Sequence, residues 1–502
     1  MLAAVWKGGI GVYVGLNVLF LAVLGIGMAV GAPADPRIVY LLLLFALCSS
    51  PVIDIDGLNG RYSLLAIFMG AYFLFYGMED LTNLFNGISS GGSTGTLTPT
   101  EVVILVGGAV LALGYRCAVN LGGPGAPSRR VNDWAMRPTI RVGLMLWVIG
   151  ILATYYWYFF VVTDKTLQGT AGISRLSEYT TTGLVLAEML QPVGFLLLVR
   201  AWRSTRSKLL FILVMAMLAI QVVFGFVIDI KGMALNGIVL VVVVVVLAEG
   251  KLPKAWLLGG TLFTVLAFPV FQTYRAVVTG SDEARTTVLS HLGATLDRVL
   301  AAEKSVSSAA VHPQTIFQRL SLKGSVQMIV DGTGNGVAFQ HGYTLTPILE
   351  AFVPRILWSD KPDIQTGRLV NATFHVSDQL DTYISPSHLG ELYWNFGWPG
   401  VVFGMLIIGA VLGCVGRLNL RQYPTVTRLL LLVITIDQLV YGFEGALANS
   451  YVVWLRSVGA IGLLHVLFAR VPMTPGSAAG ATDGVGEVRA TSPAGQFPNL
   501  MT

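Results

Sequence analysis

Charged side chains are scarce in this chain. Only 12% of its 502 residues are Asp, Glu, Lys or Arg, whereas about 25% is usual for a soluble domain. Apolar residues make up 54% of the chain, and the mean hydropathy is +0.71. This composition excludes an ordinary soluble enzyme and predicts a polytopic helical membrane protein.

Cysteine is also rare, and its placement excludes a disulfide framework. Cys48, Cys117 and Cys414 fall in or beside apolar segments, where a free cysteine behaves as a small hydrophobic residue. The longest polar interval has none. No tight group of His, Cys, Asp and Glu is present either, so we expect no metal site. The net charge of +5 does not indicate nucleic-acid binding, because in a membrane protein the placement of Lys and Arg matters more than their sum.

Long apolar runs predict the spanning helices. A helix needs about 20 mostly apolar residues to cross a bilayer. Twelve segments fit this description approximately: 9–31, 38–53, 62–78, 101–119, 139–162, 182–200, 208–229, 232–249, 255–274, 398–416, 426–445 and 448–469. No small-residue cleavage site follows the first of them, so we interpret it as a retained helix and not as a signal peptide. The sequence predicts an all-α membrane protein with about twelve transmembrane helices.

The basic residues of the short loops predict the orientation. If the loops are numbered alternately from a cytoplasmic N-terminus, most Lys and Arg fall on the inner side, and the short outer loops hold only Arg37, Lys165, Arg175 and Lys231. This is the positive-inside pattern, and it predicts that both termini are cytoplasmic. The predicted division of the chain is helices 1–9 in residues 1–274, a periplasmic loop domain in 275–397, helices 10–12 in 398–470 and a disordered cytoplasmic tail in 471–502.

The long outer interval is predicted to be part-helical. Residues 283–310 and 313–330 mix apolar and polar side chains at helical spacing, as in helices that lie along a membrane interface. Glycines then interrupt the pattern at positions 332, 334, 336 and 342. Another outer loop, 79–100, is rich in Gly, Ser and Thr and carries Glu79 and Asp80; it is either the lining of an outer cavity or a plain connector.

The end of the outer interval concentrates groups that suit a phosphorylated sugar lipid. In VPRILWSDKP, Trp358 is an interfacial anchor, and Arg355 and Lys361 carry the cations. Arg binds phosphate through a planar fork and Lys acts as a point charge. The alternative is that both cations contact lipid headgroups or pair with Asp360 and Asp363.

Two further cations lie on the predicted outer side, against the positive-inside bias. Arg275 ends the ninth predicted helix, and Lys231 lies in the tight DIKG connection. An anionic substrate would explain both positions. The alternatives are snorkelling side chains and, for Lys231, pairing with Asp229.

The next run, SPSHLGELYWNFGWPG, holds two titratable candidates. Ser385 followed by Pro386 predicts a helix start. His388 and Glu391 are then three residues apart on one helix face. Either side chain is able to accept a proton from a sugar hydroxyl; the alternative is a structural histidine and a capping carboxylate.

These two runs resemble the bacterial oligosaccharide repeat-unit polymerases, the Wzy-type O-antigen and exopolysaccharide polymerases. That group often carries a P-R-x-x-W-x-x-K-P-like run late in a large periplasmic loop, and a G-E-x-Y-x-N-F-G-x-x-G-like run before the next helix. The matching residues here are Pro354, Arg355, Trp358, Lys361 and Pro362, then Gly390, Glu391, Tyr393, Asn395, Phe396, Gly397 and Gly400. The resemblance in detail covers residues 352–400, and elsewhere it is one of architecture.

The resemblance implies a glycosyltransferase of the GT-C type in the bacterial inner membrane that builds lipopolysaccharide O-antigen or exopolysaccharide. The donor would be a growing glycan on undecaprenyl pyrophosphate, the acceptor one lipid-linked repeat unit, and a chain-length regulator a possible partner. Neither a metal nor another cofactor is required. The resemblance implies that Arg275 and Arg355, with Arg319 or Lys361, stabilise the leaving group. It implies that His388 or Glu391 accepts the proton. The sugars would stack on four aromatic residues, Trp358, Tyr383, Tyr393 and Trp394. Lys231 stands where the family often has Arg.

Three other functions remain open from the sequence. A ligase-like transferase would share the donor and the fold but pass the glycan to lipid A core or protein. A transporter or flippase would explain Asp437, Glu444 and Arg456, which fall in or near the last two predicted helices. A scaffold for polysaccharide export would leave the Arg, His and Glu set without a role. The absence of an internal repeat and the concentration of polar residues outside the membrane favour the polymerase.

Overall fold

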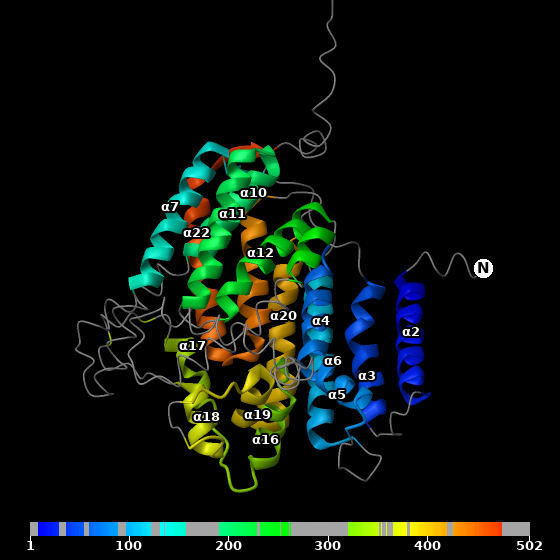
Figure 1. The fold of residues 1–502 in the computed structure, drawn as a ribbon. Helices are drawn as coiled ribbons and strands as arrows, with labels where there is room; N and C mark the ends of the chain where they lie inside the picture. The colour runs from blue at the N-terminus through cyan, green and yellow to red at the C-terminus, as the bar shows by residue number, and fades with distance from the viewer. Residues whose placement is uncertain are drawn as a thin grey trace, which may run out of the picture.

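The computed structural model describes residues 9–29, 37–54, 60–88, 97–121, 131–134, 136–156, 190–227, 231–250, 253–260, 262, 320–350, 353, 358, 365–378, 382–418 and 425–473. Helices dominate these residues (Figure 1). Among the described residues, seven helices are long and apolar enough to cross a membrane, or eight if one bent pair is counted as a single span. The predicted all-α membrane class is therefore confirmed.

The spans coincide with the apolar runs of the sequence. They are α2 (Gly9–Ala29), α6 (Pro99–Asn120), α7 (Met136–Tyr156), α11 (Lys208–Val227), the continuous stretch Ser387–Gly416, the stretch Val426–Glu444, and α22 (Leu447–Phe468), with α4 (Ser63–Tyr76) and α5 (Met78–Phe85) as the bent pair. Three further predicted spans coincide with α3 (Arg37–Ser49), α10 (Leu190–Thr205) and α12 (Lys231–Glu249), of which α3 and α10 have 13 and 16 residues. The predicted span 255–274 lies mostly outside the described residues.

The stretch Ser387–Gly416 is too long for one straight span. Its 30 residues would reach about 45 Å as a helix, whereas the hydrocarbon core is about 30 Å thick. The break falls at Gly397, whose φ of 62° lies in the left-handed region that glycine tolerates. The break lies within α19 (Ser387–Pro399), two residues before its end, and the π-turn Gly400–Gly404 and α20 (Met405–Gly416) follow it.

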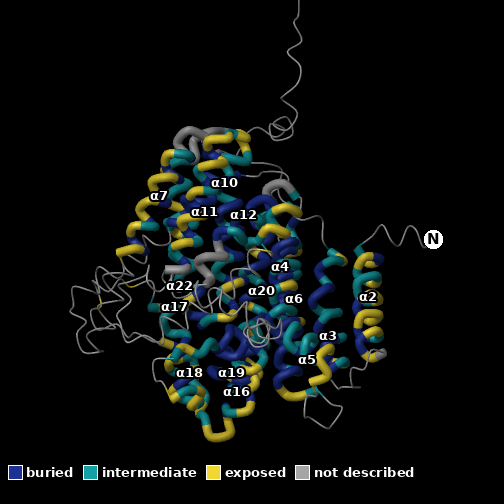
Figure 2. The backbone as a smooth tube through the Cα atoms, in the orientation of Figure 1, coloured by how far each residue is buried: buried dark blue, intermediate teal, exposed yellow. Residues whose placement is uncertain are grey.

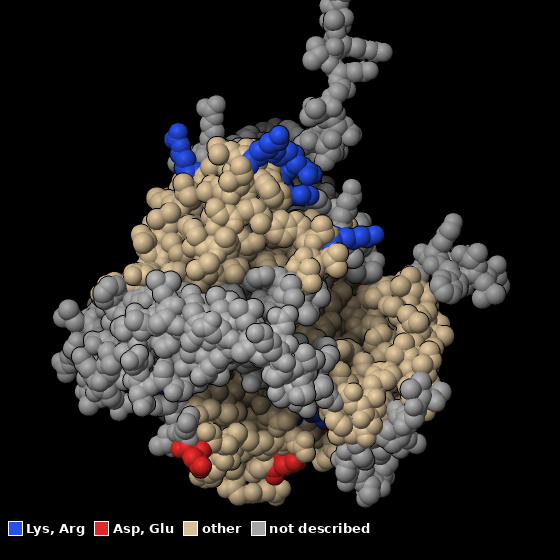
Figure 3. Space-filling model, viewed as in Figure 1, with Lys and Arg blue, Asp and Glu red and all other residues tan. Residues whose placement is uncertain are grey.

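The helix ends gather at two opposite ends of the bundle. At one end, Arg116 Nε donates to Asp54 Oδ2 over 2.9 Å. Figure 3 shows Lys and Arg gathered over this end, near the junction of α10 and α11, and Asp and Glu at the opposite end. We call these the cationic end and the distal end. Among the described residues next to the loops predicted to face inward, Arg203, Arg206, Lys208 and Arg417 fall at the cationic end.

Glycines allow α6 and α20 to pack closely in the middle of the bundle. A Cβ at Gly409 would collide with the carbonyl oxygen of Leu111, and one at Gly413 would lie 2.6 Å from the carbonyl oxygen of Tyr115. Small residues four apart let helix backbones approach in this way inside membranes. Figure 2 shows buried residues concentrated where the helices face one another, while α2 remains largely exposed.

Substituting Gly409 with Ala is expected to destabilise the protein by about 1–3 kcal/mol, because the two helices must separate to admit the methyl group. The control is Gly459→Ala in α22, where a Cβ would meet nothing within 4 Å. There the change removes backbone freedom and is neutral or slightly stabilising. Thermal unfolding in detergent measures both variants, and equal melting temperatures would contradict the close packing of α6 on α20.

One two-stranded sheet is present in the described part of the chain. Val131–Trp134 (β1) pairs antiparallel with Ala469–Met473 (β2). The indole of Trp134 donates to Thr427 Oγ1 over 3.0 Å, which fixes the ribbon to the start of α21 (Val426–Thr435). The first residues of the predicted tail, 471–473, belong to β2, and residues 474–502 lie outside the described part.

Candidate functional site

Four short helices form a layer across the distal end of the bundle (Figure 1). They are α16 (Lys323–Gly332), α17 (Thr346–Glu350), α18 (Thr366–Phe374) and α19, and we call them the cap layer. The predicted interruption by glycine is confirmed, since Gly334, Gly336 and Gly342 have φ values of 85°, 104° and 91°. Residues 283–310, the other predicted interfacial helix, lie outside the described residues.

A buried cluster of charged side chains holds α16 against α5 and α6. Lys323 Nζ lies 2.6 Å from Asp80 Oδ2 and 2.8 Å from Glu101 Oε1. The ammonium group also lies 4.5 Å from the ring centre of Tyr40. Side-chain exposure is only 15% for Lys323, 10% for Asp80 and 7% for Glu101. We call these three charged residues the Lys323 cluster.

The sequence did not reveal the Lys323 cluster. Asp80 was noted only as an acid in the outer interval 79–100, whose first residues instead form helix α5. Lys323 was not singled out. The backbone N–H of Leu322 also donates to the carbonyl oxygen of Phe75 over 3.0 Å, so α16 is anchored at the same point by a main-chain contact.

Helix α19 begins where the sequence predicted, directly after Pro386. Its first residue, Ser387, has a φ of 57°, an unusual conformation for a residue other than glycine. The hydroxyl of Tyr76 donates to Ser387 Oγ over 3.2 Å, and the same oxygen accepts the N–H of Gly390 over 3.2 Å. The strained start of α19 is therefore fixed both to α4 and within its own first turn.

His388 is completely buried. Its ring centre lies 5.0 Å from that of Phe443 and 6.1 Å from that of Tyr451. Within the described residues, neither ring nitrogen makes a hydrogen bond. A buried imidazole with so few polar contacts is uncommon, and the backbone of Gly442 is the polar group that lies beside the ring.

Glu391 is also completely buried, one turn further along α19. Its Oε2 accepts the backbone N–H of Leu447, the first residue of α22, over 2.6 Å. A carboxylate at a helix N-terminus satisfies an N–H that has no partner within the helix and complements the helix dipole. Oε1 has no hydrogen-bond partner among the described residues.

Asn395 joins the preceding loop to α19. Its Nδ2 donates to Thr344 Oγ1 over 2.7 Å and to the carbonyl oxygen of Glu391 over 2.8 Å. Its Oδ1 accepts the N–H of Gly342 over 2.8 Å. Together with the break at Gly397, these contacts give residues of the G-E-x-Y-x-N-F-G-x-x-G run specific roles in holding the cap layer.

The four aromatic residues predicted to stack on sugars differ in how far their side chains are exposed. Trp394 is fully buried, 5.5 Å from the ring of Phe374, and Tyr393 is half-buried. Tyr383 and Trp358 expose 49% and 39% of their surfaces. Partial burial and the nearby Glu391 carboxylate raise the pKa of the Tyr383 hydroxyl, which keeps it neutral. Only Tyr383 and Trp358 therefore present accessible rings for sugar stacking or for the membrane interface.

The predicted phosphate-binding cations are not placed by the structure. Arg275, Arg319, Arg355 and Lys361 lie outside the described residues. Lys231 begins α12, and its side chain is likewise outside the described part. The structure thus brings His388, Glu391, Tyr383 and Trp394 together in one layer. In the described part of the chain, no three His, Cys, Asp or Glu residues are grouped as metal ligands.

Comparisons with known proteins give no match: no family model, no curated protein and no solved structure is similar to this chain.

Proposed function

We propose that this protein is a membrane glycosyltransferase that polymerises lipid-linked oligosaccharide repeat units at its distal end. The observation that carries the proposal is the cap layer, in which Glu391 of the G-E-x-Y-x-N-F-G-x-x-G run fixes α19 to α22, and Ser387, just before the run, fixes it to α4. The layer lies opposite the cationic end, on the side that the positive-inside rule assigns to the periplasm. About twelve spanning helices and a GT-C-like arrangement are part of the same proposal.

The proposed reaction joins two lipid-linked glycans. The terminal hydroxyl of the acceptor attacks the anomeric carbon of the donor glycan, and the bond from that carbon to the pyrophosphate oxygen breaks. The pyrophosphate leaves with the electron pair, and a protein base takes the hydroxyl proton. Undecaprenyl pyrophosphate remains in the membrane, and the glycan becomes longer by the acceptor's repeat unit.

Cations, titratable side chains and aromatic rings have different roles in the proposed reaction. Arg275 and Arg355, with Arg319 or Lys361, are proposed to neutralise the leaving pyrophosphate. His388 and Glu391 are the two candidate bases, since the ring nitrogens of His388 and the Oε1 atom of Glu391 lack hydrogen-bond partners in the described residues, while Oε2 of Glu391 caps α22. Tyr383 and Trp358 expose the rings that would stack on sugars.

Reconstitution tests the proposal. The full-length protein in detergent is given lipid-linked repeat units extracted from a host strain that lacks it, with EDTA present, and the products are separated on a gel. We expect a ladder of glycans. Arg355→Ala and His388→Ala should each shorten or abolish the ladder, and removal of a general base typically lowers the rate by about 10²–10⁴-fold. The control is Arg368→Ala, which removes an exposed cation of the cap layer outside the two motifs.

Other outcomes identify the other functions. Movement of the unit across proteoliposome membranes without a ladder would contradict the polymerase and favour a flippase. Transfer that appears only when lipid A core or a protein acceptor is added would favour the ligase-like reaction. Equal ladders from all variants would remove His388 and Arg355 from the proposed mechanism.

A further inference from the structure

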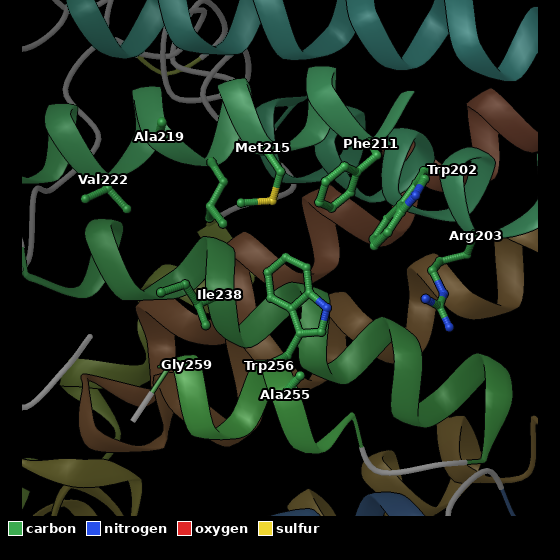
Figure 4. Close-up of a pocket in the computed structure, with 12 residues that line it drawn as sticks. Trp202, Arg203, Phe211, Met215, Ala219, Val222, Ile238, Ala255, Trp256 and Gly259 are labelled. Carbon is green, nitrogen blue, oxygen red and sulfur yellow. The ribbon is translucent and has the colours of Figure 1, made fainter. Parts of the chain in front are cut away.

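An apolar cavity opens at the cationic end, far from the cap layer. It lies between α10, α11, α12 and the helical residues 254–260, and its volume is about 610 Å³. Figure 4 shows Trp202, Phe211 and Trp256 around one part of the cavity, and Val222 and Ile238 at another. None of the described residues that line it is acidic.

The lining is amphipathic along the length of α11. Arg203 and the two tryptophans mark one end, where the Arg203 guanidinium lies 5.3 Å from the ring centre of Trp202. Toward the other end the lining is aliphatic, with Met215 and Val222 from α11. Phe211 and Val222 are separated by about 16 Å along the helix axis, so the cavity has the length of a substantial part of an acyl chain.

The basic residues around the cavity favour a negatively charged lipid headgroup. Lys208 begins α11 close to the end of α10 that carries Arg203, and Lys254 lies at the start of the adjoining helical segment. Tryptophan at the membrane interface combines an apolar ring with a polar N–H that favours headgroup depth. A ligand with an apolar chain and a negative phosphate complements both parts of this cavity.

We propose that this cavity is a binding site for one anionic phospholipid, with an acyl chain between α10, α11 and α12 and the phosphate at Arg203. The site is independent of the proposed glycan reaction, since it lies at the opposite end of the bundle. It fastens α10, α11 and α12 together through a lipid, and it makes the stability of the protein depend on the lipid composition of the membrane.

Native mass spectrometry of the full-length protein tests the site. The probes are palmitoyl-oleoyl phosphatidylglycerol, phosphatidylcholine with the same chains, and inorganic phosphate alone. We expect one retained phosphatidylglycerol per chain, weaker retention of phosphatidylcholine and none of phosphate. Phosphatidylglycerol should also raise the melting temperature. Arg203→Gln is expected to weaken binding of phosphatidylglycerol about tenfold, as loss of one charge-assisted contact would.

Two further variants separate the cavity from general surface charge. Arg206→Gln removes the same charge at the same end without altering the cavity lining, so it should leave binding within about twofold of the unchanged protein. Gly259→Phe should fill the cavity, because a Cβ at Gly259 meets nothing within 4 Å, and it should prevent chain binding while the lipid-free melting temperature is retained.

Three results would overturn the proposal. Equal losses in Arg203→Gln and Arg206→Gln would show diffuse electrostatic attraction only. Equal retention of phosphatidylcholine would remove the phosphate selectivity. Full phosphatidylglycerol binding by folded Gly259→Phe would show that the chain lies elsewhere.

Discussion

Replacing Lys323 with Met is expected to destabilise the protein by about 3–5 kcal/mol, because the change removes the ammonium group that two buried carboxylates share. Asp80 and Glu101 both lie within hydrogen-bond distance of Lys323 Nζ, at 2.6 Å and 2.8 Å. Thermal unfolding in detergent should show a large fall in melting temperature. Limited proteolysis should show that α16 detaches first.

A matched control and a rescue make the Lys323 result specific. The Arg116–Asp54 pair has a similar N–O distance of 2.9 Å, but its side chains are 30% and 35% exposed. Arg116→Gln should therefore cost less than about 1 kcal/mol. Adding Asp80→Asn and Glu101→Gln to Lys323→Met removes the unpaired charges and should restore much of the lost stability. A small effect of Lys323→Met alone would show that the cluster is hydrated and not buried.

Glu391→Ala is expected to cost about 3 kcal/mol, since it removes the acceptor of the Leu447 N–H and leaves a small cavity. Glu391→Gln keeps a carbonyl oxygen that accepts the same N–H, so it should preserve the melting temperature much better. Comparison of the two variants in thermal unfolding separates the hydrogen bond from the charge.

The glycan ladder then assigns the role of Glu391. As a residue that positions α19 on α22, Glu391 should tolerate Gln with only a few-fold loss of polymerisation, and Ala should lower activity and stability together. A loss of about 10²–10⁴-fold in Glu391→Gln with an unchanged melting temperature would instead make Glu391 the base. His388→Gln in the same assay provides the comparison with the other candidate.

The membrane class and most helix positions could be predicted because each depends on a local pattern. An apolar run of bilayer length forms a helix wherever it occurs, since no other backbone structure except a closed barrel satisfies its own hydrogen bonds in lipid. The start of α19 followed from Ser385 and Pro386, and the break after α16 followed from its glycines. The bent junction of α4 and α5 was missed because the acids and the Gly- and Ser-rich residues after it indicated a loop.

Contacts between distant residues could not be predicted in the same way. Lys323 is separated by 243 residues from Asp80 and by 222 from Glu101, and neither spacing leaves a local signal. The burial of His388 and Glu391 also depends on Phe443 and Leu447, which belong to another part of the chain. The sequence predicted their shared helix face correctly, but not that α22 covers it.

The attachments of the cap layer restrict how this protein is able to move. Ser387 is bonded to Tyr76 of α4, Glu391 to Leu447 of α22, and Lys323 to residues of α5 and α6. Early and late helices of the bundle are therefore joined at the distal end through one short helical layer. Alternating access by rocking of one bundle half against the other would have to break these bonds in every cycle.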